Sequence, residues 1–163
     1  TEHRDKIEKY MDIAKEDGAT IATGGKRPSR EDLKDGLFFE PTVITNCDTH
    51  MRIVQEEVFG PVVTVEGFSD EAEAIRLAND SIYGLAGAVF SKDIGKAQRV
   101  ANKLKLGTVW INDFHPYFAQ APWGGYKQSG IGRELGKEGL EEYLTSKHIL
   151  TNTNPEPVNF FSK

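Results

Sequence analysis

The segment EEVFGPV, residues 56–62, holds the residues best suited to binding chemistry. In extended backbone, alternate side chains point to the same side, so Glu57 and Phe59 would lie together just before the Gly60-Pro61 bend. A carboxylate can accept two hydrogen bonds from a sugar diol, and a phenyl face can pack on a flat heterocycle. This would make a small binding clamp, although the residues alone favour a solvated acidic pair followed by a core phenylalanine.

A second candidate is the long segment that follows residue 112, which lacks a periodic pattern. Disordered segments are depleted in aromatic residues, so an aromatic loop of this length indicates function. The preceding run, residues 107–112, reads as a buried strand. An aromatic loop at the end of such a strand is typical of a pocket wall. Its aromatic residues are Phe114, Tyr117, Phe118, Trp123 and Tyr126.

Other patterns lack the context of the sites that they imitate. GIGRELG, residues 130–136, has dinucleotide-like glycine spacing, but a polar loop precedes it and no acidic residue ends the following strand. The four histidines have no zinc spacing. Cys47 is the single cysteine, without a cationic group near it in sequence, and we expect a structural thiol. The chain therefore contains no self-sufficient catalytic set.

The order of the elements predicts an α/β fold with a parallel sheet covered by helices. Continuous apolar runs alternate with helical segments, as in parallel sheets. We expect Ser69 to cap one helix, and a second helix to begin at Asp93. The buried face of the first would consist of Ala72, Ile75, Leu77 and Ala78. The predicted helices are 4–16, the two that begin at 69 and 93, and 133–144; the predicted strands are 20–23, 38–45, 58–68, 85–91, 107–112 and 147–151.

Composition excludes some functions. A net charge of -5 without a basic stripe argues against nucleic-acid binding, and no apolar run is long enough to span a membrane. A single cysteine favours a reducing, cytoplasmic compartment. The chain begins without Met in a charged helix, so we expect a piece of a longer protein. The lone strand 147–151 is expected to pair with a distant segment or another subunit.

Four motifs together resemble the C-terminal part of the aldehyde dehydrogenase superfamily, in the family's order and over nearly the whole chain. The resemblance implies that residues 1–144 are the latter part of a catalytic domain and residues 145–163 a C-terminal oligomerisation strand and tail. The motifs are EEVFGPV at 56–62, YGLAGAVFS at 83–91, GTVWIN at 107–112 and PWGGYKQSGIGRELG at 122–136.

The resemblance also implies roles for particular residues. Glu57 resembles the glutamate that holds the nicotinamide ribose and Phe59 its neighbour against the nicotinamide, which reverses the preference for a structural pair. His115, Tyr117 and Trp123 resemble pocket residues of the betaine aldehyde branch, where aromatic faces attract a trimethylammonium head. Aromatic residues line most aldehyde pockets, so other aminoaldehydes remain open as substrates.

The resemblance implies further roles for three residues of the glycine-rich motif. The backbone carbonyls of Lys127 and Gly130 resemble ligands of a potassium ion. Glu134 resembles a glutamate with a proton-relay role; a carboxylate at a helix N-terminus is the alternative. The family's nucleophilic cysteine, general-base glutamate and Rossmann domain would precede this chain. We therefore expect the isolated chain to be inactive.

The resemblance thus implies part of an NAD- or NADP-dependent enzyme that oxidises betaine aldehyde to glycine betaine, an osmoprotectant. We expect a homo-oligomer that acts on a small aldehyde and binds neither nucleic acid nor membrane. Two alternatives are another aminoaldehyde dehydrogenase and a non-catalytic assembly module that associates through residues 147–151.

Overall fold

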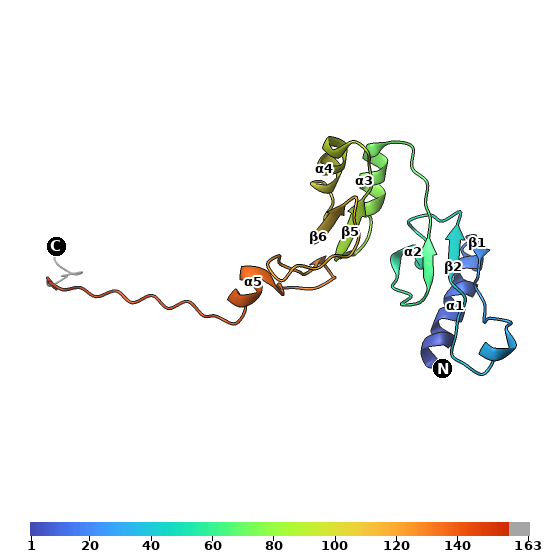
Figure 1. The fold of residues 1–163 in the computed structure, drawn as a ribbon. Helices are drawn as coiled ribbons and strands as arrows, with labels where there is room; N and C mark the ends of the chain where they lie inside the picture. Colours follow the sequence, from blue (N-terminus) through green and yellow to red (C-terminus); the bar gives the residue numbers. More distant parts are fainter. Residues whose placement is uncertain (157–163) are drawn as a thin grey trace, which may run out of the picture.

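The computed structural model of the chain describes residues 1–156, and the end of the predicted tail, 157–163, lies outside the described residues. The chain forms two α/β units, followed by an extended segment that leads away from them (Figure 1). The first unit is residues 1–65 and the second is residues 69–144. An α/β architecture is therefore confirmed.

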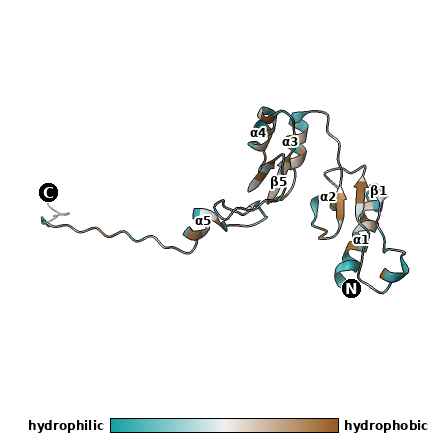
Figure 2. Cartoon of the chain, viewed as in Figure 1, coloured by the Kyte–Doolittle hydropathy of each residue, from teal (hydrophilic) through white to brown (hydrophobic). Residues whose placement is uncertain are grey.

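The first unit has a three-stranded sheet in the order β1-β2-β3, with β1 antiparallel and β3 parallel to β2. Hydrophobic residues concentrate in the strands near α2, and hydrophilic residues cover much of α1 (Figure 2). Ile7, Met11 and Ala14 of α1 pack against Ile44 of β2 in one buried cluster. The elements are α1 (Glu2–Glu16), β1 (Thr20–Thr23), a 3-10 turn η1 (Glu31–Leu33), β2 (Thr42–Thr45), α2 (Arg52–Gln55) and β3 (Val62–Thr64).

The second unit is built on the parallel pair β5-β6, in which Ala86–Val89 faces Thr108–Ile111. A short antiparallel pair, β4-β7, brings the end of the aromatic loop back to this unit. Asp93 caps α4 as expected, because its side chain accepts a hydrogen bond from the Lys96 amide at 2.9 Å. The elements are α3 (Glu71–Asn79), β4 (Tyr83–Gly84), β5 (Ala86–Val89), α4 (Ile94–Ala101), β6 (Thr108–Ile111), β7 (Tyr126–Lys127) and α5 (Gly136–Glu141).

Several predicted boundaries were wrong. The strands predicted at 38–45 and 58–68 begin only at β2 and β3, directly after Pro41 and Pro61, because proline has no N–H for a ladder. Asp70, not Ser69, caps α3 by accepting from the Glu73 amide at 2.8 Å. Ser69 instead donates its hydroxyl to the Glu73 carboxylate at 2.6 Å.

The expected apolar face of α3 is only partly covered. Ile75 and Leu77 are half-buried, whereas Ala72 and Ala78 are exposed. The helix predicted at 133–144 begins only at Gly136, because Glu134 is held in extended backbone by a bridge to Trp123.

Within the described residues the strands form three small sheets, two of which contain one of the expected parallel pairs, β2-β3 and β5-β6. The chain exposes 12219 Å², well above the ~8,100 Å² of a compact monomer of this mass. Large apolar side chains such as Phe68 and Phe90 are 64% and 69% exposed. These faces have the character of surfaces that other protein would cover.

The predicted strand at 147–151 has no ladder within the described part of the chain. Ile149 and Leu150 are 77% and 83% exposed on the extended segment. Without a partner strand no hydrogen-bonded ladder can form, so pairing with a distant segment or another subunit stays a prediction.

The aromatic loop returns to β6 through a close approach of two glycines. A Cβ added at Gly107 would lie 1.6 Å from the carbonyl oxygen of Gly124. Only residues without side chains allow two backbones to approach this closely. Gly107 therefore fixes where the loop crosses the strand.

We expect Gly107→Ala to lower the free energy of unfolding by about 1–3 kcal/mol, because the added methyl group forces the loop backbone away. Urea unfolding of the chain measures this. Gly67→Ala is the matched control, since a Cβ there meets nothing within 4 Å. Equal effects of the two substitutions would show that the glycine approach is unimportant.

Candidate functional site

Glu57 and Phe59 lie on the segment between α2 and β3 and are both exposed, Phe59 by 69%. The alternative of a core phenylalanine is therefore wrong. Phe59 has φ 53, a left-handed conformation that is uncommon for an aromatic residue. The extended-chain argument that placed the two side chains on one side does not hold, because the backbone turns at Phe59.

Two residues of α1 hold this turn, and sequence reasoning missed both. His3 Nε2 contacts the carbonyl oxygen of Phe59, and Lys6 Nζ donates to the carbonyl oxygen of Glu57 at 3.0 Å. The Lys6 ammonium also lies 5.8 Å from the centroid of the Phe59 ring. Their i, i+3 spacing on one helix face is the signal that could have found them.

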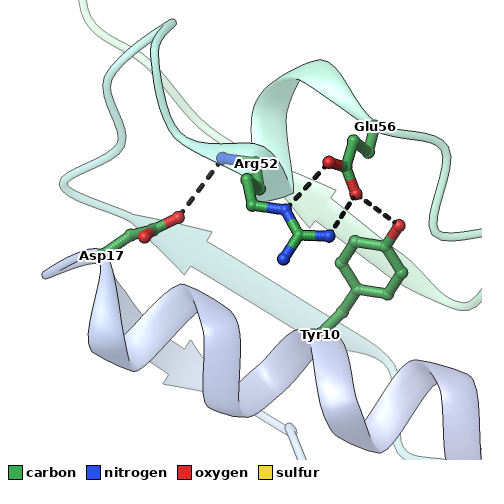
Figure 3. Close-up of polar contacts among 4 residues, drawn as sticks. All are labelled: Tyr10, Asp17, Arg52 and Glu56. Atoms are coloured by element: carbon green, nitrogen blue, oxygen red, sulfur yellow. Dashed lines mark hydrogen bonds and ion pairs between the residues drawn. The ribbon is translucent and has the colours of Figure 1, made fainter.

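Glu56, the neighbour of Glu57, is a structural residue. Its carboxylate accepts two hydrogen bonds from Arg52, at 2.8 and 2.9 Å, and one from the Tyr10 hydroxyl at 2.7 Å (Figure 3). The Arg52 hydrogen bonds and then Tyr10 lower the pKa of Glu56 from 4.5 to about 2. Arg52 is itself placed by Asp17, which accepts from its amide at 3.2 Å. This cluster ties α2 to α1 directly before the clamp.

The clamp borders an apolar hollow of about 380 Å³. Its wall includes Phe38, Phe39 and Phe59. Arg4 closes one side and donates to the carbonyl oxygen of Gly36 at 2.8 Å. A flat ring could pack on Phe59 at this edge, while the Glu57 carboxylate stays in solvent.

The aromatic loop gathers its rings into one cluster, defined here as Trp110, Phe114, His115, Tyr117 and Trp123. The His115 and Tyr117 rings are 4.9 Å apart, and Tyr117 and Trp123 are 4.7 Å apart, both edge to face. The Tyr117 hydroxyl lies 3.2 Å from His115 Nε2. The three predicted substrate residues are thus brought together.

Trp110 belongs to this cluster although the sequence pointed only to its strand. Its ring lies 5.7 Å from His115 and 6.1 Å from Trp123, and only 9% of the residue is exposed. GTVWIN reads as a buried strand, so nothing in its sequence marked Trp110 as a neighbour of the loop rings.

The glycine-rich turn after Trp123 brings together the residues of the weaker assignments. A hollow of about 320 Å³ is lined by Trp123, Gly130 and Glu134, among others. Glu134 is exposed and precedes α5, so it is not a first-turn helix carboxylate. Its backbone bridges Trp123 at 2.6 and 2.7 Å.

Lys127 anchors the same turn to the end of α3. Its ammonium donates to the carbonyl oxygens of Asn79 and Ser81, both at 2.9 Å. These are carbonyls at or just beyond the helix end, where a cation is favoured. Lys127 has φ 54, a strained conformation that this anchor helps to hold.

The clamp and the aromatic cluster remain separate. The hollow beside Phe59 and the hollow beside Trp123 have no lining residue in common. A third hollow, of about 940 Å³ between β3 and the α3-α4 pair, contains none of the predicted site residues. It is bordered by exposed apolar side chains such as Phe68 and Phe90, which is typical of a packing surface.

Cys47 has the properties of a structural thiol. It is half-buried, its Sγ lies 3.7 Å from the carbonyl oxygen of Ile44, and burial raises its pKa. A raised pKa disfavours the reactive thiolate. In residues 1–156 no group of three or more His, Cys, Asp or Glu side chains could hold a metal ion. No helix in this range is long and apolar enough to cross a membrane.

Comparison with known proteins gives a consistent result. Residues 1–149 match the model of the aldehyde dehydrogenase family. The chain is 68% identical over 161 residues to betaine aldehyde dehydrogenase of Bacillus subtilis, covering 99% of the chain and 33% of that protein. It is 52% identical to a peroxisomal aminoaldehyde dehydrogenase of Pisum sativum, over 96% of the chain and 31% of that protein. The chain thus spans about a third of the length of these curated relatives.

A solved structure is closer still. Betaine aldehyde dehydrogenase of Staphylococcus aureus in complex with NAD+ is 90% identical, with a TM-score of 0.96 over 100% of this chain and 32% of that one. The two units and their loops therefore have the arrangement found in part of that larger protein.

The Glu56 cluster predicts a pH dependence of stability. A carboxyl group whose pKa is lower in the folded state binds fewer protons there, so its stabilising effect is lost as pH falls from about 4.5 toward 2. We expect the urea midpoint of unfolding of Glu56→Gln to fall less over this pH range than the midpoint of the unsubstituted chain. Glu57→Gln removes the same charge one residue away and should leave the acid-induced loss unchanged. Identical acid profiles for all three proteins would contradict this assignment.

Proposed function

Because the chain belongs to the aldehyde dehydrogenase family, we propose that it is part of a longer NAD-dependent enzyme that oxidises betaine aldehyde to glycine betaine. The observation that carries this proposal is the edge-to-face contact of Tyr117 with both His115 and Trp123. The names of the relatives and the NAD+ complex of the Staphylococcus aureus enzyme support the substrate and the cofactor.

The clamp fits one end of NAD. When bound, NAD accepts the hydride that the aldehyde loses as it becomes an acid. Glu57 would accept hydrogen bonds from the two ribose hydroxyls, and its exposed carboxylate is free of the ion pair that occupies Glu56. Phe59 would pack against the nicotinamide, with its backbone held by His3 and Lys6. NADP is the other cofactor that this part of a site could accept.

The aromatic cluster fits the substrate. A trimethylammonium head has no N–H to donate, and ring faces attract it by cation–π contacts that contribute ~0.5–2 kcal/mol each. His115, Tyr117 and Trp123 present closely spaced rings for this purpose. Aminoaldehydes are the competing substrates, and the Pisum sativum relative supports that alternative.

The chemical step needs a nucleophile that this chain does not supply. Cys47 is the single cysteine and is a half-buried thiol with a raised pKa. In the proposed enzyme, a cysteine in another part of the protein attacks the aldehyde carbon, and water later releases the acid. This chain would hold the cofactor and the substrate during that reaction.

Three finer assignments are part of the proposal. Lys127 and Gly130 would offer backbone carbonyls to a potassium ion, and the Lys127 anchor on α3 supports a fixed turn there. Glu134 would relay protons beside Trp123, on the hollow that both line. We also propose a cytoplasmic homo-oligomer.

Subunit pairing through residues 147–151 is also the basis of the second candidate function, a non-catalytic assembly module. The exposure of Ile149 and Leu150 favours an interface on this segment. Cofactor binding by the complete protein would argue against a purely structural role.

We expect the 163-residue chain alone to form no NADH with betaine aldehyde, whereas the complete enzyme that contains it does. Absorbance at the NADH band measures both. Turnover by the isolated chain would contradict the proposal that the nucleophile comes from elsewhere.

In the complete enzyme, we expect Glu57→Gln to raise the KM for NAD by roughly 10-fold or more, because hydrogen bonds to a charged acceptor contribute ~1.5–3 kcal/mol each. Initial rates at varied NAD test this. Glu16→Gln makes the same charge change at the far end of α1 and should leave KM unchanged. An unaltered KM in Glu57→Gln would remove this residue from the cofactor site.

We expect Trp123→Ala to raise the KM for betaine aldehyde by about 2- to 30-fold, in line with the loss of one or two cation–π contacts. The uncharged isostere 3,3-dimethylbutanal, in which carbon replaces the quaternary nitrogen, should be affected much less. The ratio of kcat/KM for the two aldehydes is the measurement. Equal losses for both would favour a merely apolar pocket.

A further inference from the structure

We propose that Trp110 is a positioning residue that sets the spacing of the substrate-binding rings and thereby the preference for a quaternary ammonium aldehyde. This inference rests on the proposed function. Trp110 would act through His115, Tyr117 and Trp123 and not by touching the substrate, because only 9% of it is exposed.

Trp110 differs from the rest of its strand. It is the only buried residue of β6, whose other three residues are half-buried. Its ring lies 5.6 Å from Phe114, 5.7 Å from His115 and 6.1 Å from Trp123. It therefore contacts both the outgoing and the returning part of the loop from beneath.

A hydrogen bond from Trp110 also fixes the position of the loop backbone. The indole Nε1 of Trp110 donates to the carbonyl oxygen of Pro116 at 3.1 Å. Pro116 stands between His115 and Tyr117, so the bond fixes the backbone between the two rings. Tryptophan combines a large apolar ring, which fills this buried position, with an N–H that donates to the loop.

The backbone of the loop is in an unfavourable conformation at His115, so it needs contacts that stabilise it. His115 has φ 74, a left-handed conformation, and it also precedes a proline, which restricts it further. Conformations of this kind are unfavourable for a residue with a side chain and persist only when the surroundings enforce them. The contacts of Trp110 with the His115 ring and the Pro116 carbonyl are such an enforcement.

The other side of the cluster is fixed independently. The Trp123 backbone is paired with Glu134 at 2.6 and 2.7 Å, and the Gly107-Gly124 approach seats the next residue on the strand. The His115-Tyr117 side has the Trp110 hydrogen bond instead. Loss of that bond should change the distances and angles between the Trp123 ring and the rings of His115 and Tyr117.

The test uses the complete enzyme with Trp110→Phe, which removes the indole N–H but keeps an aromatic ring. Trp110→Tyr, which fills more of the indole volume, is measured in parallel in case the first variant folds poorly. Phe118→Leu is the matched control, because Phe118 is 61% exposed and outside the ring cluster. Each protein is assayed for kcat and KM with betaine aldehyde and with 3,3-dimethylbutanal.

We expect the KM for betaine aldehyde to rise about 3- to 10-fold in both Trp110 variants, with kcat within about 2-fold and a smaller change for 3,3-dimethylbutanal. The effect should largely disappear when Trp123→Ala is already present, because residues that act as one unit are non-additive. Phe118→Leu should retain the preference.

A preference retained within about 2-fold by both Trp110 variants would overturn the inference, as would a proportional loss of kcat for both aldehydes, which indicates general damage. These outcomes leave the proposed function standing. If the unsubstituted enzyme itself does not prefer betaine aldehyde over its isostere, the proposed function is wrong and this inference falls with it.

Discussion

The close approach of Gly107 and Gly124 is the constraint on which the candidate substrate site depends. The loop leaves β6 and returns beside Gly107, the residue directly before that strand, and a side chain at Gly107 would separate the two backbones. Because the return point is fixed, Trp123 comes within reach of Trp110 and Tyr117. Aromatic residues distributed along a flexible loop would otherwise have no common geometry.

In both candidate regions a residue with a structural role lies next to the candidate binding residues. Glu56 is held by Arg52 and Tyr10, whereas Glu57 next to it extends its carboxylate into solvent. In the same way Trp110 is buried beneath a cluster whose other members reach the surface. A binding group can remain exposed and still be well placed when its neighbour is anchored.

Local signals in the sequence were sufficient for much of the fold and part of the site. The periodicity of α1 and the aspartate before α4 gave correct helices, and the apolar runs gave the parallel pairs. Pairing between Trp123 and Glu134 overrode a plausible helix at 133–144, and a left-handed turn at Phe59 overrode strand alternation. Neither could be foreseen, because both depend on contacts with distant residues. The grouping of His115, Tyr117 and Trp123 was anticipated, but Trp110 was hidden within an ordinary strand pattern.

Left-handed backbone at residues with side chains is concentrated near the two candidate binding regions. Phe59, His115 and Lys127 all have positive φ, a conformation in which glycine or asparagine would be more stable. The candidate binding regions therefore keep a backbone conformation that their residues do not favour locally. Evolution or engineering directed at thermal tolerance alone would tend to relax these positions first, so the geometry of the two candidate binding regions would change before the fold was lost.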